Sequence, residues 1–209
     1  MTMTMTPDAF ADALREGEAY LAAADPPLAK VMQAQGPLAA ERYRREPFTA
    51  LLQALIGQQL STHAAASIAR RLWALAGAPP TPQAVLALDA DALRGCGLSA
   101  GKTRSALAIA RAVDAGTLDL AALAVVDEAA VIAALTVLPG VGPWTAHMFL
   151  MFGQGRLDVF APGDLGLRRA LQRLDDLTAL PSPAVALERA ERWRPYRTVA
   201  AWQLWRWLA

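Results

Sequence analysis

The residues with the clearest chemical potential are a turn that contains two glycines and a carboxylate that follows it. Gly140 and Gly142 flank one apolar residue within residues 138–146, which read Leu-Pro-Gly-Val-Gly-Pro-Trp-Thr-Ala. Because glycine has no side chain, the backbone N–H groups of such a turn can approach an anion closely. Asp164 follows in a Pro-Gly-Asp sequence and supplies a reactive carboxylate. Together they predict a phosphate-binding turn with an acidic group acting beside it.

Apolar runs with helical periodicity on both sides of the turn predict that it connects two helices. Asp127 suits the N-cap of the first run, and Pro143 opens the second, where its missing N–H costs nothing. The result is a helix–hairpin–helix, whose second helix directs its positive end at one DNA phosphate without reading a base. The residues predicted to contact this phosphate are Gly140, Val141, Gly142 and Thr145. A tight helical corner without a ligand is the alternative, since Gly-x-Gly alone is a weak signal.

Composition indicates the class of fold that must carry this turn. The chain has 209 residues, 55% of them hydrophobic, which is enough for a buried core. Apolar residues recur every three or four positions, so the sequence predicts an all-α protein. The short helices favour two small helical subdomains with a groove between them, and the helix–hairpin–helix would make that groove a DNA-binding cleft. The predicted helices are 8–23, 27–34, 37–43, 47–59, 62–76, 82–87, 89–95, 100–115, 118–123, 127–137, 143–152, 164–174, 183–191 and 195–208.

Charge and cysteine content narrow the function classes. The net charge is only +1, but residues 1–41 hold six acidic and two basic side chains, so the remainder carries +5. Cys96 is the single cysteine, which excludes a disulfide framework and a four-cysteine iron–sulfur cluster within the chain. A reducing cytoplasm is therefore expected. Neither a signal peptide nor an apolar run of about 18 residues is found, so we expect no membrane association.

Three spaced motifs together identify a family resemblance. They are the glycine turn at 138–146, Asp164 in its Pro-Gly-Asp setting, and residues 48–61, which read Phe-Thr-Ala-Leu-Leu-Gln-Ala-Leu-Ile-Gly-Gln-Gln-Leu-Ser. With the block at 191–197, they resemble the helix–hairpin–helix/Gly-Pro-Asp superfamily of DNA glycosylases. Within it the chain is similar to the 3-methyladenine DNA glycosylase II branch, in a compact form. The resemblance covers roughly residues 45–208.

The resemblance gives Asp164 a role. Asp164 precedes a helix, so N-capping is its simplest role. A fixed negative charge also stabilises the oxocarbenium-like sugar that forms when an N-glycosidic bond breaks, and it orients a water for attack. Capping and catalysis are compatible, and Asp158 is expected to be structural. Trp144 stands where bifunctional relatives place a Schiff-base lysine, so water is the expected nucleophile and no lyase activity is expected.

The resemblance also assigns a wedge turn and a base pocket. A base must leave the helical stack before its sugar can be reached, and the matching residues for filling the gap are Gln59 and Leu60. The alternative is that Leu60 is an ordinary core residue. Aromatic faces favour a cationic alkylated base, and the implied pocket residues are Trp144, Met148 and Trp205. Met148 replaces an aromatic residue common in relatives. Trp193, Tyr196, Trp202 and Trp207 are expected to be packing residues.

These expectations define the organisation and the partners. Residues 1–45 are a helical leader that contributes to the second subdomain, 46–155 hold the wedge turn and the hairpin, and 156–209 close the lesion pocket. No cofactor is required. The resemblance implies a structural monovalent cation, held by the main-chain carbonyls of Thr136, Leu138 and Val141.

The overall expectation is a base-excision-repair hydrolase. It would act as a monomer on double-stranded DNA containing alkylated bases such as 3-methyladenine and 7-methylguanine, in the cytoplasm of a bacterium, at the nucleoid. A non-catalytic helix–hairpin–helix module that binds DNA is the alternative, although such a module has no need of Asp164. A helical protein–protein scaffold would need neither the glycine turn nor the carboxylate.

Overall fold

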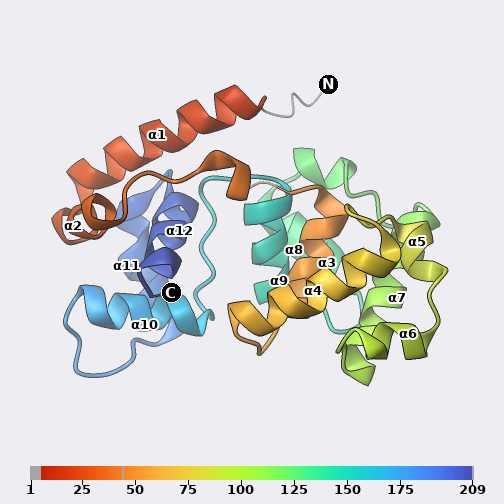
Figure 1. Cartoon of the computed structure of the whole chain (residues 1–209). Coiled ribbons are helices and arrows are strands. Elements are labelled where there is room, and N and C mark those ends of the chain that lie inside the picture. The colour runs from red at the N-terminus through yellow and green to blue at the C-terminus, as the bar shows by residue number, and fades with distance from the viewer. Residues whose placement is uncertain (1–5, 44, 209) are drawn as a thin grey trace. The chain divides into compact units, whose positions relative to one another are not determined.

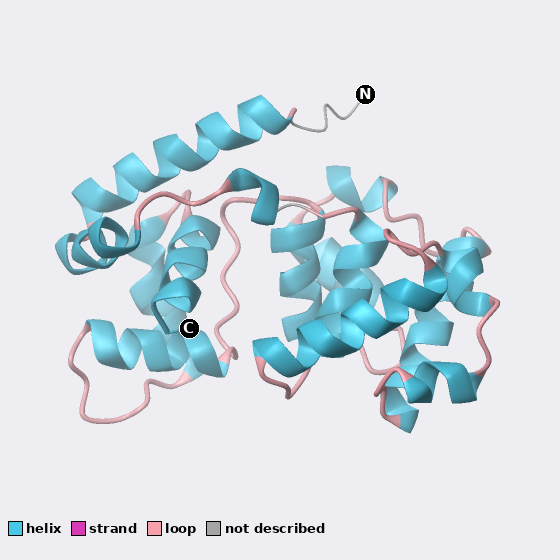
Figure 2. Ribbon diagram, in the orientation of Figure 1, coloured by secondary structure: helices cyan, strands magenta, loops and turns pink. Residues whose placement is uncertain are grey.

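The computed structural model describes residues 6–43 and 45–208, and throughout these residues helices are joined by turns and loops without any strand (Figure 2). The all-α prediction is therefore confirmed. The chain forms two compact units (Figure 1). The first combines the described parts of residues 3–44 and 155–209, and the second is residues 45–154. No helix within the described ranges has the length and apolar character that crossing a membrane requires.

The first unit is built from two separate stretches of sequence. Its elements are α1 (Pro7–Ala24), α2 (Pro26–Gln35), the 3-10 turn η1 (Ala40–Arg42), α10 (Leu165–Leu174), α11 (Pro183–Ala190), the 3-10 turn η4 (Glu191–Trp193) and α12 (Arg197–Leu208). Helix α12 packs against α1, α2 and α10. Leu14 and Leu21 of α1 are buried, and Phe10 lies edge-on to Trp202 with ring centroids 6.3 Å apart. The N-terminal helices are thus part of this unit's core.

The second unit is arranged around one apolar helix. Its elements are α3 (Pro47–Gly57), α4 (Thr62–Ala76), α5 (Pro82–Leu86), α6 (Ala90–Gly95), α7 (Ala100–Asp114), the 3-10 turn η2 (Ala122–Val125), α8 (Glu128–Thr136), α9 (Pro143–Met148) and the π-helical turn η3 (Phe149–Gly153). Helix α3 packs against α4, α7, α9 and η3. Leu51, Leu52, Leu55 and Ile56 are buried, as expected for a helix that is apolar on all sides. The turn that follows α3 therefore starts from a rigid support.

Most helices begin with a side chain that caps their first turn. A hydroxyl or carboxylate oxygen accepts a hydrogen bond from a backbone N–H that has no partner inside the helix. Proline often follows the cap, because the first helical position needs no N–H. The capping residues are Thr6, Asp25, Glu46, Ser61, Thr81, Asp89, Ser99, Asp127, Asp164 and Ser182. This regular pattern is why helix starts could be predicted from sequence.

The helix predicted at 37–43 is wrong, because only a 3-10 turn forms at Ala40–Arg42. Side chains satisfy the backbone of this segment instead. The N–H of Leu38 donates to the Glu18 carboxylate at 2.9 Å, and Arg206 donates to the carbonyl of Pro37 at 3.1 Å. Because these backbone groups already bond to side chains of other elements, the segment does not need the hydrogen bonds of an α-helix.

The helix predicted at 118–123 is also wrong, because its residues form a turn that leads into η2. The Asp119 carboxylate accepts hydrogen bonds from the N–H groups of Ala121 and Ala122, at 2.9 and 3.0 Å. This side chain competes with helical backbone bonding. The helix predicted at 143–152 is present, but it changes from α to π geometry at Phe149.

A buried ion pair joins the two stretches of the first unit. The Asp25 side chain is fully buried, accepts a hydrogen bond from the Trp193 indole at 2.7 Å, and lies 2.7 Å from Nη1 of Arg189. Arg189 also contacts Asp175, which is more exposed. Burial alone would raise the pKa of Asp25, but the hydrogen bonds from Arg189 and Trp193 outweigh it and hold the pKa below its ordinary value of 3.8. The charged form of Asp25 therefore stabilises this unit.

We predict that Asp25→Asn lowers the free energy of unfolding at pH 7 by about 3 kcal/mol, because it breaks a buried ion pair and leaves the buried Arg189 with the more exposed Asp175 as its remaining carboxylate partner. Asparagine retains the cap of α2, so the change isolates the charge. Urea unfolding measures the loss. Asp175→Asn is the matched control, and it should cost less because Asp175 is partly exposed.

The same ion pair predicts a pH dependence. Because the folded pKa of Asp25 is lowered, its contribution to stability is complete above the unfolded value and is lost as pH falls through the folded pKa, below 3.8. The unfolding free energy of the native protein should thus fall more steeply with acidification in that range than that of Asp25→Asn. Parallel curves for the two proteins would contradict the assignment.

Candidate functional site

The predicted helix–hairpin–helix is present, formed by α8, the turn at 137–142 and α9. The Asp127 carboxylate caps α8 by accepting from the Ala130 N–H at 2.7 Å, as predicted. Gly140 has a φ of +75°, and a Cβ built on it would lie 2.2 Å from Oγ of Ser105. The fold itself therefore requires glycine at this position.

Gly142 differs from Gly140 in its surroundings. Its backbone is extended, with φ −108° and ψ 177°, and a Cβ there would meet no atom within 4 Å. Nothing inside the protein therefore demands a glycine. The open space lies directly before α9, whose first N–H groups have no intrahelical partner. The backbone here is accessible to an approaching anion.

The other two predicted phosphate contacts are more enclosed. Val141 is 6% exposed, and its N–H donates to the Leu138 carbonyl at 3.1 Å, which closes the turn. The Thr145 side chain is 1% exposed, and its hydroxyl accepts a hydrogen bond from Nε2 of Gln58 at 2.8 Å. The backbone rather than the hydroxyl is thus the part of Thr145 suited to an anion.

The predicted wedge turn links α3 to α4. Gln59 has a φ of +56°, a backbone conformation that residues other than glycine rarely adopt. Gln59 is exposed and Leu60 is 41% exposed. Ser61 caps α4 by accepting from the Ala64 N–H at 3.2 Å. The alternative that Leu60 is a core residue is wrong, since the turn directs two large side chains outward.

The carboxylate of Asp164 is held by two donors. Oδ1 accepts from the Leu167 N–H at 2.7 Å, which caps α10 as predicted, and from the Trp205 indole N–H at 2.9 Å. A Cβ added at Gly166 would lie 3.0 Å from Oδ1 and 3.3 Å from the Trp205 ring, so the small residue keeps these groups close. The side chain is half-buried. Its orientation is fixed before any ligand arrives.

Asp158 has a different environment. Its carboxylate lies 2.7 Å from Nη1 of Arg194 and 2.7 Å from Nε of Arg197, and the Arg197 side chain is only 7% exposed. Arg197 also donates to the Asp158 carbonyl at 2.7 Å. This carboxylate is occupied in joining the 156–159 segment to α12. The prediction that Asp158 is structural is confirmed.

The residues predicted to pack in the core and those predicted to line the base pocket differ in burial. Trp193 and Trp202 are buried, which confirms them as packing residues, whereas Trp205 is half-buried against Asp164. Trp144 is half-buried, and its ring would lie 3.8 Å from a Cβ on the last residue of α3. Met148 is 6% exposed. Trp144 and Met148 belong to the second unit, and Trp205 belongs to the first.

The proposed cation ligands lie at the end of α8 and in the turn. Thr136 is the last residue of α8, and the last carbonyls of a helix lack intrahelical partners. The Leu138 carbonyl accepts one hydrogen bond, from Val141, and retains a second lone pair. Carbonyl oxygens are hard ligands suited to hard cations. The chemistry of these three donors fits a monovalent cation. Among the described side chains, no group of His, Cys, Asp or Glu could hold a metal.

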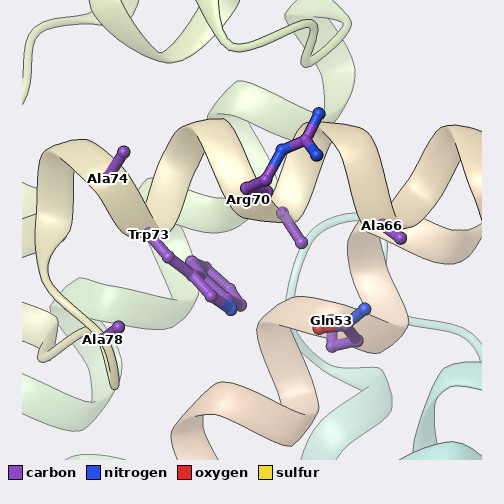
Figure 3. Close-up of a pocket in the computed structure, with 7 residues that line it drawn as sticks. Gln53, Ala66, Arg70, Trp73, Ala74 and Ala78 are labelled. Atoms are coloured by element: carbon purple, nitrogen blue, oxygen red, sulfur yellow. The ribbon is translucent and has the colours of Figure 1, made fainter.

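A separate pocket lies between α3 and α4, with a volume of about 500 Å³ (Figure 3). Its lining residues are Gln53, Ala66, Ala69, Arg70, Trp73, Ala74 and Ala78. None of the residues predicted to do chemistry lines it. Its lining includes no residue of the glycine turn or of the wedge turn, which are joined by the hydrogen bond from Gln58 to Gly140.

Sequence reasoning missed three polar contacts at these sites. Trp205 was expected to line a pocket, and its hydrogen bond to Asp164 was not foreseen. Gln58 was passed over, yet its amide bonds to both the Gly140 carbonyl and Thr145, each at 2.8 Å. Lys102 was not assigned any contact, yet its ammonium donates to the carbonyls of Ile56 and Gln58. Of these three residues, only Gln58 could have been suspected from the sequence, because it directly precedes the predicted wedge residues Gln59 and Leu60.

Comparisons with known proteins agree with this arrangement. Residues 52–195 match the model of the HhH-GPD superfamily of base excision DNA repair proteins. The chain is 34% identical over 166 residues to DNA-3-methyladenine glycosylase 1 of Schizosaccharomyces pombe, covering 78% of this chain and 73% of the relative. It is 32% identical to DNA-3-methyladenine glycosylase 2 of Escherichia coli, but it covers only 55% of that protein against 74% of its own length.

The fold comparison leads to the same group. The structure of the S. pombe 3-methyladenine DNA glycosylase in complex with abasic DNA matches with a TM-score of 0.84 and 31% identity, covering 91% of this chain and 95% of the other. The family model spans more than half of the chain and includes the wedge turn, the hairpin and Asp164. This chain belongs to the HhH-GPD superfamily of base excision DNA repair proteins.

Proposed function

We propose that this protein is a DNA glycosylase that hydrolyses the N-glycosidic bond of alkylated bases in duplex DNA. The observation that carries the proposal is Asp164, whose Oδ1 is fixed by the Leu167 N–H and the Trp205 indole. A carboxylate held in this way is a preorganised negative charge. It stabilises the positive charge that develops on the sugar as the bond to the base breaks, and it orients the attacking water.

The second unit would bind the duplex and extrude the base. The backbone N–H groups around Gly142 would bind a phosphate, which positions the protein without reading sequence. Gln59 and Leu60 project from their turn and would occupy the space that the flipped nucleotide leaves. A monovalent cation on the carbonyls of Thr136, Leu138 and Val141 would reinforce the phosphate contact by charge.

The kind of base that this site would excise can be inferred from how readily the base acts as a leaving group. N-alkylated purines such as 3-methyladenine and 7-methylguanine carry a positive charge, so they depart without a general acid and stack on electron-rich aromatic faces. The relatives' names specify 3-methyladenine. Trp144, Met148 and Trp205 are the proposed pocket residues. The protein would act as a monomer in the bacterial cytoplasm, at the nucleoid.

Water is the proposed nucleophile, so the enzyme would be monofunctional. Trp144 occupies the position at which a Schiff-base lysine would follow the hairpin. Lys102 has its ammonium on the carbonyls of Ile56 and Gln58, which occupies it structurally. Asp164 would then direct water at the sugar carbon. The products would be a free base and an unbroken abasic strand.

We predict that Asp164→Asn lowers the single-turnover excision rate by about 10²-fold or more, because it removes a preorganised charge but keeps the shape of the cap. The assay uses duplexes that carry 7-methylguanine, 1,N6-ethenoadenine or hypoxanthine, together with methylated DNA that contains 3-methyladenine. Abasic sites are then cleaved with alkali.

Asp158→Asn is the matched control for this experiment. It should lower thermal stability, because Asp158 pairs with Arg194 and Arg197, while the folded fraction still excises bases. Full activity of Asp164→Asn with native stability would overturn the catalytic assignment. Absence of excision by the unaltered protein, with duplex binding retained, would favour the non-catalytic module.

The two hairpin glycines should respond differently to substitution. Gly142→Val is expected to fold normally, because its backbone is extended and its Cβ meets nothing within 4 Å. The added methyl groups would obstruct a phosphate, so affinity for damaged and undamaged duplexes should fall equally. Fluorescence anisotropy with both duplexes measures this.

Gly140→Val is the companion variant, and it should destabilise the fold by about 1 kcal/mol or more, because a β-branched residue is strained at positive φ. The clash with Ser105 adds to the cost. If Gly142→Val weakened binding to damaged duplex alone, the turn would have to recognise the lesion rather than a phosphate.

We predict that borohydride traps no covalent adduct between this protein and damaged DNA, because no lysine stands at the Schiff-base position. Product strands should remain unbroken until alkali is added. Denaturing gels show both results. A trapped adduct that disappears in Lys102→Met would transfer nucleophilic attack to that lysine and contradict the monofunctional proposal.

A further inference from the structure

Lys102 of α7 reaches the end of α3 rather than solvent. Its ammonium donates to the Ile56 carbonyl at 2.7 Å and to the Gln58 carbonyl at 2.7 Å. The residue also lines a pocket of about 370 Å³. Desolvation by burial lowers its pKa. A cation that gives up hydration in this way must be compensated by its new partners.

The two carbonyls are the ones that define the wedge turn. Ile56 lies in the last turn of α3, where helical carbonyls lose their partners, and Gln58 is the residue just before Gln59. Gln59 holds a positive φ of 56°, a conformation that persists only where surrounding contacts impose it. The ammonium fixes the backbone on the N-terminal side of this strained residue.

The side chain of Gln58 extends the connection to the hairpin. Its amide donates to the Gly140 carbonyl and to the Thr145 hydroxyl, both at 2.8 Å. One bond therefore lies on each side of Gly142. A second contact restrains the same region, because Ser105, one turn beyond Lys102 on α7, packs against Gly140.

We propose that Lys102 is a positioning residue that fixes the wedge turn and, through Gln58, holds it in register with the phosphate-binding hairpin. The inference rests on the proposed function, because it gives those two elements their roles. Its physical reason is that a wedge fills a gap only if it stands at a set distance from the gripped phosphate. Lys102 supplies this constraint without touching the reacting atoms.

The test begins with the free protein, so that it does not depend on any substrate. Hydrogen–deuterium exchange is compared for the native protein and Lys102→Met, which retains the aliphatic stem but not the donor. We expect faster exchange in the peptides that cover 57–61 and 137–142. Lys102→Arg, which keeps a donor, should restore protection in part.

Arg111→Met is the matched control, because it removes the same charge from an exposed position of α7 that does not line this pocket. It should leave exchange in both peptides unchanged. Gln58→Leu should speed hydrogen exchange in the 137–142 peptide and leave the Lys102 contact with Ile56 in place. If Lys102→Met does not fold, Gln58→Leu still tests the coupling between the two turns. Unchanged exchange in 57–61 would overturn the positioning role, and unchanged exchange in 137–142 would overturn the coupling.

A second arm measures excision of 7-methylguanine in single turnover at saturating protein, where differences in affinity no longer contribute. Lys102→Met should lower the maximum rate roughly tenfold, since small displacements of positioning groups are costly, while Arg111→Met stays within about twofold. Equal rates for the two variants would overturn the inference. If the native protein excises nothing, the proposed function fails, while the exchange experiment still decides the role of Lys102.

Discussion

Unsatisfied backbone groups at helix ends are the constraint on which this structure depends. A chain of short helices has many ends, and each leaves N–H or carbonyl groups without partners. Here side chains from the adjacent sequence satisfy most starts, as Asp164 does for α10. The same groups that cap helices are also the groups suited to chemistry. Asp164, the glycine turn and the wedge turn all lie at helix termini, where backbone and side chain are exposed together.

The electrostatic character of the protein also follows from local placement rather than from total charge. The net charge of +1 is small for a protein that would bind a polyanion. Several arginines are engaged internally, as Arg189 is with Asp25 and Arg197 is with Asp158. These pairs stabilise the first unit. In the second unit the phosphate contact would come from the backbone, which carries no formal charge and does not appear in a residue count.

The sequence predicted the helices well wherever a cap and an apolar period agreed, as at 62–76, whose bounds match α4. It failed at 37–43 and 118–123, where side chains rather than helical bonds satisfy the backbone. For the site, motif spacing located Asp164 and the glycine turn. It could not show that Trp205 bonds to Asp164, because residues 41 positions apart meet only through the fold. Nor could the sequence show that the fold requires glycine at position 140 but not at position 142, because the contact between Gly140 and Ser105 exists only in the folded chain.

The discontinuous make-up of the first unit determines the order in which the chain can fold. The second unit, residues 45–154, is continuous and can complete its core as soon as it has emerged from the ribosome. The first unit must wait, because Asp25 meets Trp193 only across 168 positions of sequence. During synthesis the apolar faces of α1 and α2 therefore stay uncovered until α12 has been made.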